Sequence, residues 1–153
     1  MKQYASHFAL AALVSALLVG CSSSNDEYQP AAKDTQLAAA AASTTFPMNL
    51  KAEDDPHLVA MVNAQSGDLT IRNFGTDGLA NFDVWVNQAY VLHVNRLDPN
   101  SSRTIKTIDL YNSAGNNMSS LPPGSVRTVQ IATNDGRGSR LLNVQGPQLV
   151  TGQ

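Results

Sequence analysis

The chain has 153 residues and a formal net charge of −2, with 10 basic and 12 acidic side chains. Its basic residues are scattered, which argues against nucleic-acid binding because that requires a concentrated basic face. Cys21 is the only cysteine, so no disulfide within the chain and no multi-cysteine metal site is available to stabilise the fold.

The N-terminal segment has the organisation of an export signal. Lys2 supplies a positive charge, an apolar stretch follows over residues 8–19, and small residues lie close behind it. The stretch is shorter than the roughly 20 apolar residues that a membrane-spanning helix needs, and its length and order are typical of a signal peptide. We therefore predict a signal peptide over residues 1–20 and not a transmembrane anchor.

The end of this segment, Leu18, Val19, Gly20 and Cys21, resembles the bacterial lipobox. The resemblance implies that Cys21 receives a diacylglyceryl group, that the signal is cut before it, and that its new amine is acylated. A single acyl chain holds a protein to a bilayer only marginally, whereas two or more hold it stably. Because Ser22 stands where an Asp resembles an inner-membrane retention signal, we expect anchoring in the outer membrane, facing the periplasm or the cell surface.

Residues 21–55 are predicted to form a lipidated, flexible tether. Their first part is polar and poor in apolar side chains, and such a segment cannot bury enough surface to order itself. The alanine-rich stretch at residues 37–42 can form a transient helical turn. Isolated helices shorter than about 12–15 residues are marginal in water, so no stable helix is expected there.

Residues 56–153 are predicted to form one small all-β domain. Short β-rich runs alternate with turn residues such as Ser66-Gly67, Pro122-Pro123-Gly124 and Asp135-Gly136, and about seven strands with this spacing indicate a β-sandwich or a small barrel. The expected strands lie near residues 57–62, 68–74, 81–87, 89–94, 103–110, 126–132 and 140–144.

Three segments of this domain are similar to the immunoglobulin-like modules of secreted bacterial proteins, of the CARDB or fibronectin-like kind. They are LTIRNFG at 69–75, FDVWVN at 82–87 and LDPNSSRTI at 97–105. The resemblance implies a single small immunoglobulin-like sandwich of about seven strands that acts as a spacer, an interaction surface or an adhesive element. The chain departs from the pattern at Asn100, where a glycine is usual, and it has no inter-sheet cysteine pair.

We find no motif for catalysis, and we expect no enzyme activity, cofactor or metal. The acidic residues before His57 are interpreted as an exposed turn preceding the first strand, because their spacing matches no known metal site. His93 is interpreted as a half-exposed strand histidine. Residues 135–138 (DGRG) are interpreted as a hairpin connection and not as a phosphate-binding loop.

Trp85 is the most suggestive surface candidate. It alternates with Phe82, Val84 and Val86, so it lies on the opposite face of its strand. If that face is exposed, Trp85 forms a ligand or partner contact with Asp83, Asn87 and Tyr90, since aromatic rings beside polar groups suit sugar stacking and protein contacts. The alternative is that a loop or the tether covers Trp85.

These observations favour a membrane-anchored envelope lipoprotein whose non-catalytic sandwich mediates protein–protein contacts. Its expected partners are the membrane, through Cys21, and an envelope protein, with no nucleic acid. The alternative function is a carbohydrate- or peptidoglycan-binding module that uses Trp85. A third hypothesis, a small metal-dependent or hydrolytic enzyme with an unrecognised site, has no motif in its favour.

The lipobox assignment predicts the fate of a Cys21→Ser variant. Because serine offers no thiol for the diacylglyceryl group, the variant should remain unacylated and should not be cut by the lipoprotein signal peptidase. Mass spectrometry of the membrane fraction measures both features. A variant that is still lipidated and processed would show that Cys21 is not the anchor.

Overall fold

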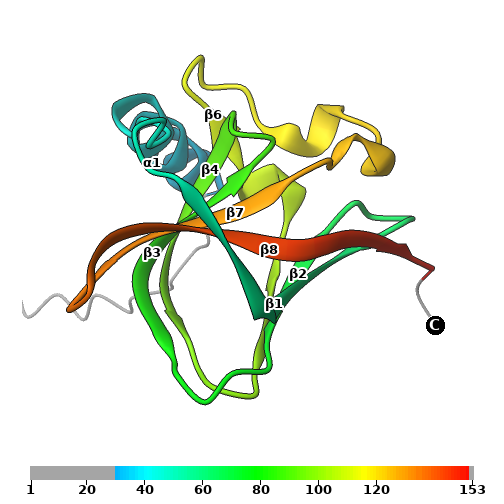
Figure 1. Cartoon of the computed structure of the whole chain (residues 1–153). Helices are drawn as coiled ribbons and strands as arrows, with labels where there is room; N and C mark the ends of the chain where they lie inside the picture. Colours follow the sequence, from blue (N-terminus) through cyan, green and yellow to red (C-terminus); the bar gives the residue numbers. More distant parts are fainter. Residues whose placement is uncertain (1–29, 152–153) are drawn as a thin grey trace, which may run out of the picture.

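The computed structural model describes residues 30–151, which comprise one α-helix, eight strands and three 3-10 turns. The signal peptide, the lipobox with Cys21 and the first part of the tether lie outside the described residues. The elements, shown in Figure 1, are α1 (Pro30–Ser43), β1 (Ala52–Asn63), β2 (Leu69–Asn73), β3 (Leu79–Val86), β4 (Tyr90–Leu97), β5 (Ser102–Ile105), η1 (Thr107–Asp109), β6 (Tyr111–Asn112), η2 (Met118–Ser120), η3 (Pro123–Ser125), β7 (Val129–Asp135) and β8 (Gly138–Val150).

The strands form one curled, mixed sheet in the order β5-β2-β1-β8-β7-β3-β4-β6. Neighbours pair antiparallel except β1 and β8, which pair in parallel. The all-β class predicted from the sequence is therefore confirmed. Each of the seven expected runs contributes to a strand, whereas the two-residue strand β6 was not foreseen.

Strand β1 pairs with β8 along its length and gains a second partner, β2, in its later part. Residues 52–55 pair with β8 alone, whereas residues 58–62 pair with β2 on their other side. Between these two parts the β1–β8 register shifts, from Asp55 to Val59, and Pro56 lies within the shift. A proline has no backbone N–H to donate to a ladder, so it is tolerated at such an irregularity. The bend lets one strand join the two halves of the sheet.

The concave side of the sheet holds the main hydrophobic core. Phe82, Val84 and Val86 point into it and are at most 2% exposed, which confirms the alternation predicted for this strand. Leu58, Ala60 and Val62 of β1 contribute from the opposite wall. Burial of a Leu, Val or Phe side chain stabilises the fold by about 1.5–3 kcal/mol each.

The opposite face of the sheet carries a second, smaller apolar cluster, over which α1 packs. Its members are Ala41, Trp85, Val91 and Tyr111, with Leu37, Ala38, Phe46 and Ala132 against them. The prediction of a flexible tether without a stable helix is therefore wrong for residues 30–55: they form α1, a covering segment and the start of β1. The alanine-rich stretch is helical because tertiary packing supplies the stability that a short isolated helix lacks.

This packing also decides between the two interpretations of Trp85. Its side chain is only 4% exposed, and the ring of Phe46 meets it edge-on with centroids 5.3 Å apart. Of the two interpretations left open for Trp85, the one in which the tether covers it is therefore confirmed, and the one in which it is exposed is not. The indole Nε1 is buried without a hydrogen-bond partner in the described part of the chain.

The contact between α1 and the sheet predicts the behaviour of an Ala41→Asp variant. Ala41 is 2% exposed, and burying an unpaired carboxylate there is costly, so the helix should separate from the sheet. Because Trp85 is the only tryptophan, acrylamide quenching of the indole fluorescence reports the change directly, and we expect it to rise several-fold.

The matched control is Ala39→Asp, which makes the same chemical change at an exposed position of the same helix. It should leave quenching close to that of the unaltered protein. Equal quenching in the two variants would mean that α1 does not shield Trp85 in solution.

Candidate functional site

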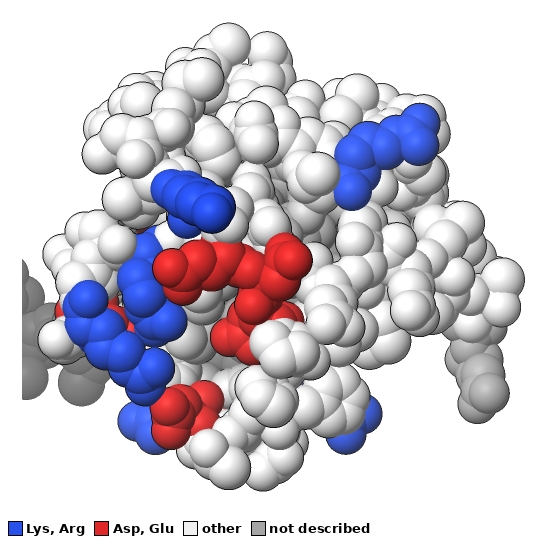
Figure 2. Space-filling model, in the orientation of Figure 1, with Lys and Arg blue, Asp and Glu red and all other residues white. Residues whose placement is uncertain are grey.

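A polar cleft opens where three segments meet: the bend of β1, the β2–β3 loop and the β7–β8 hairpin. It has a volume of about 480 Å³. Leu58 and Leu142 of the main core lie at its base, each at most 3% exposed. Figure 2 shows basic and acidic side chains gathered side by side on the part of this face where the β7–β8 hairpin lies.

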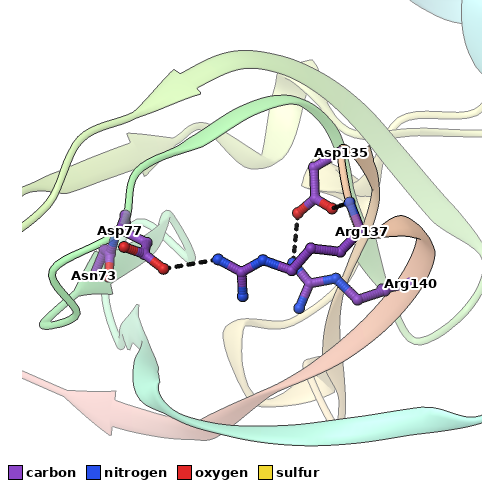
Figure 3. Close-up of polar contacts among 5 residues, drawn as sticks. All are labelled: Asn73, Asp77, Asp135, Arg137 and Arg140. Atoms are coloured by element: carbon purple, nitrogen blue, oxygen red, sulfur yellow. Dashed lines mark hydrogen bonds and ion pairs between the residues drawn. The ribbon is translucent and has the colours of Figure 1, made fainter.

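Two ion pairs lie at the cleft, one across it and one within the β7–β8 hairpin, as Figure 3 shows. Arg137 Nη2 lies 2.8 Å from Asp77 Oδ2, which links the β7–β8 hairpin to the β2–β3 loop. Arg140 Nη2 lies 2.5 Å from Asp135 Oδ2, beside the turn of the hairpin. The first pair is largely exposed and the second is partly buried. Ion pairs near the surface add little to stability, so their main consequence is to orient the four side chains.

The protonation states follow from these contacts. The backbone N–H of Arg137 donates to Asp135 Oδ1 at 2.8 Å. Together with the weaker contribution of the Arg140 side chain, this bond holds the pKa of the Asp135 carboxyl below its ordinary 3.8. The hydrogen bond from Arg137 to Asp77 raises the pKa of the guanidinium above its usual value. The cleft therefore presents charged donors beside charged acceptors at neutral pH.

The β2–β3 loop is held in place by a buried asparagine. Asn73 is 3% exposed, and its Nδ2 donates to the carbonyl oxygens of Asp77 and Asp98 at 2.8 and 3.3 Å. Its Oδ1 accepts from the backbone N–H of Gly75 at 2.8 Å. A Cβ added to Gly75 would lie 3.0 Å from that oxygen, so this close approach favours glycine. Hydrogen bonds between the Asn73 side chain and the backbone therefore hold the loop that carries Asp77.

The wall formed by β1 carries the acidic residues that precede His57. The interpretation of these residues as a turn before the first strand is wrong, because residues 52–57 belong to β1. Asp55 Oδ1 accepts from the backbone N–H of His57 at 2.9 Å, whereas Asp54 Oδ1 accepts from Asn143 Nδ2 on β8. Within residues 30–151 no group of three or more metal-ligating side chains gathers.

Of the residues singled out around Trp85, Asp83 lines a small cleft with it, whereas Asn87 and Tyr90 are not among the residues that line that cleft. Asp83 lies 2.8 Å from Nδ1 of His93, whose side chain is about half exposed as predicted. Asn87 holds the segment before β7, donating to the carbonyl of Ser125 and accepting from two backbone N–H groups. Tyr90 packs against the main core, on the other face of the sheet from Trp85.

The cleft was not predicted from the sequence. Its charged members come from residues 55–57, 77 and 135–140, which are far apart along the chain. Two sequence signals fell on its lining: the acidic residues before His57, interpreted as a turn, and the stretch at 135–138, interpreted as a hairpin connection. The structure confirms that residues 135–138 join β7 to β8.

Comparisons with protein-family models, curated proteins and solved structures find no match to this chain. Among the described residues, no helix is long and apolar enough to cross a membrane.

The pKa of Asp135 predicts how an Asp135→Asn variant responds to acid. Because folding holds this pKa below 3.8, the contacts of the carboxylate stabilise the protein fully above that pH. The stabilisation is lost as the pH falls through the depressed pKa. The unaltered protein should therefore be the more stable of the two at pH 7, with the difference shrinking in strong acid. Urea unfolding across this pH range measures it, and a difference independent of pH would contradict the assignment.

Proposed function

We propose that the chain is a lipid-anchored envelope protein, attached to the outer membrane through Cys21, whose β domain binds another protein and catalyses no reaction. The lipobox supports the anchor. The observation that carries the binding function is an unpaired sheet edge on β8, at the end of the strand that lies away from the cleft.

We infer an immunoglobulin-like arrangement for the β domain. In that fold, strands A, B and E share one sheet and strands C, F and G the other. Here β1, β2 and β5 are neighbours in the order expected for A, B and E, and β3, β7 and β8 follow the order of C, F and G. The bent β1 lies next to both β2 and β8, which explains how two such sheets can form one continuous curled sheet. The strand order thus supports the resemblance seen in the sequence.

The unpaired edge arises because β8 is longer than its neighbour. Strand β7 pairs with residues 138–143 of β8 only, whereas β1 pairs with β8 as far as Val150. Residues 145–150 therefore have a strand on one side alone among the described elements. Pro147 has no N–H to offer, so the unpaired N–H and C=O groups that can accept an added strand lie beyond it, at residues 148–150. Peptide recognition by strand addition uses this geometry.

The side chains of this overhang suit a protein partner. Leu149 is 60% exposed and Val150 37% exposed, and residues 145–150 include no charged residue. The end of β8 lies near the C-terminus marked in Figure 1, on a side that carries few charged side chains in Figure 2. Depletion of charge is typical of the centre of protein–protein interfaces.

The anchor and the domain are close together in the chain. Eight residues, 22–29, separate Cys21 from the start of α1 at Pro30, and the nine steps along the chain from Cys21 to Pro30 span at most about 30 Å when fully extended. Because α1 packs on the sheet, the folded domain begins with this helix. Tethering of this kind raises the effective concentration of the domain near partners in the same membrane.

The carbohydrate-binding alternative loses its original support. It relied on stacking of a sugar against Trp85, and that ring is enclosed by α1, Phe46 and the sheet. A sugar could reach it only after the covering segment had moved.

The docking role of β8 predicts the result of site-specific photocrosslinking in cells. A photoreactive amino acid in place of Gln148, which is exposed on the overhang, should form an adduct with one partner protein. Adding Leu149→Lys should abolish the adduct, because it removes an apolar contact and places a charge on the edge. Gel mobility and mass spectrometry of the adduct measure the effect.

The matched control is Leu121→Lys, which changes another exposed leucine outside the overhang. It should leave the adduct intact, and both variants should remain in the membrane fraction. The proposal fails if no adduct forms at position 148, or if the two variants reduce it equally.

A further inference from the structure

We propose that the polar cleft is a binding site for a neutral saccharide. The site is independent of the protein contact proposed above. It lies at the first residues of β8, whereas the unpaired edge lies at the last ones, and thirteen strand residues extend for about 40 Å. Both contacts could therefore be made at once.

The dimensions and base of the cleft suit a small ring-shaped ligand. Its volume of about 480 Å³ is within the 300–1,000 Å³ that is usual for small-molecule sites. Leu58 and Leu142 give it an apolar base. Phe74, 48% exposed, is one of the lining residues, and the guanidinium of Arg72 lies 4.4 Å from its ring centroid. A fixed aromatic ring beside polar groups can pack against the C–H face of a sugar.

The charges in the cleft favour a neutral ligand over an ion. Arg137 is paired with Asp77, and Arg140 with Asp135. A charged ligand would have to compete with a partner that is already in place. A hydroxyl group both donates and accepts hydrogen bonds, so a ligand with several hydroxyls can bond to the carboxylate and the guanidinium of one pair without separating them.

Arg140 also belongs to the lining of the cleft. Its Nε is buried and has no hydrogen-bond partner within residues 30–151, although Nη2 of the same guanidinium is bonded to Asp135. Asp55 and Thr76 also line the cleft and add a carboxylate and a hydroxyl. Directed polar groups around an apolar base are the usual means of fixing the orientation of a small ligand.

Isothermal titration calorimetry of the mature, lipidated chain tests this inference. The protein is kept in a phosphocholine detergent, because a detergent with a sugar headgroup would compete. The probes are maltotriose, cellotriose and tri-N-acetylchitotriose, with tri-galacturonate and glutamate as charged comparisons. We expect saturable binding of at least one neutral trisaccharide and weaker binding of both charged probes.

Variants locate the site. Arg137→Ala should weaken binding of the neutral trisaccharide by about tenfold or more, the loss expected for a hydrogen bond to a charged group. The matched control is Arg103→Ala, which removes an exposed arginine on β5 and should leave the affinity unchanged. Leu149→Lys should also leave it unchanged, which separates this test from the test of the unpaired edge.

Three results would overturn the inference. They are the absence of saturable binding with all three neutral trisaccharides, tighter binding of either charged probe, and an equal loss of affinity in the Arg137→Ala and Arg103→Ala variants. Because Arg137 is a largely exposed side chain, its removal should not unfold the domain, and circular dichroism confirms that the variants remain folded.

Discussion

The parallel pairing of β1 with β8 is the constraint on which the other features of this domain depend. Antiparallel neighbours alone would leave two separate sheets, one containing β2 and β5 and the other containing β3, β4 and β7. Strand β1 joins them because it bends at Pro56 and keeps β8 as a partner on both sides of the bend. The same bend forms one wall of the polar cleft, and the length of the pairing carries β8 beyond the end of β7.

The two proposed contacts therefore share one structural element. The start of β8 forms the hairpin that supplies the paired arginines, and its end provides an edge without charged side chains. The difference in chemistry follows from position: the hairpin adjoins the β2–β3 loop, where Asp77 is held by Asn73, whereas the overhang adjoins only β1. A polar ligand and a protein surface could thus be held at opposite ends of one strand.

The packing of α1 on the sheet shows how a helix that is marginal by itself can be stabilised by tertiary contacts. The helix is rich in alanine, so it can lie close to the sheet, and its residues Leu37, Ala38 and Ala41 pack in the cluster around Trp85. Residues 44–51 complete the cover through Phe46. Propensity alone would leave so short a helix marginal; its stability comes from apolar surface on β3, β4 and β6, which are distant in sequence.

Local patterns in the sequence were enough to predict the β class, the approximate positions of seven strands and the inward face of residues 82–86, because alternation of side chains along a strand is a local property. The half-exposed state of His93 and the hairpin at residues 135–138 followed from equally local patterns. Three other features follow from contacts between distant segments: Trp85 is covered, residues 30–43 are helical, and Asp77 is paired with Arg137. Each of these depends on which segments the chain brings together over tens of residues, and no local pattern specifies that pairing.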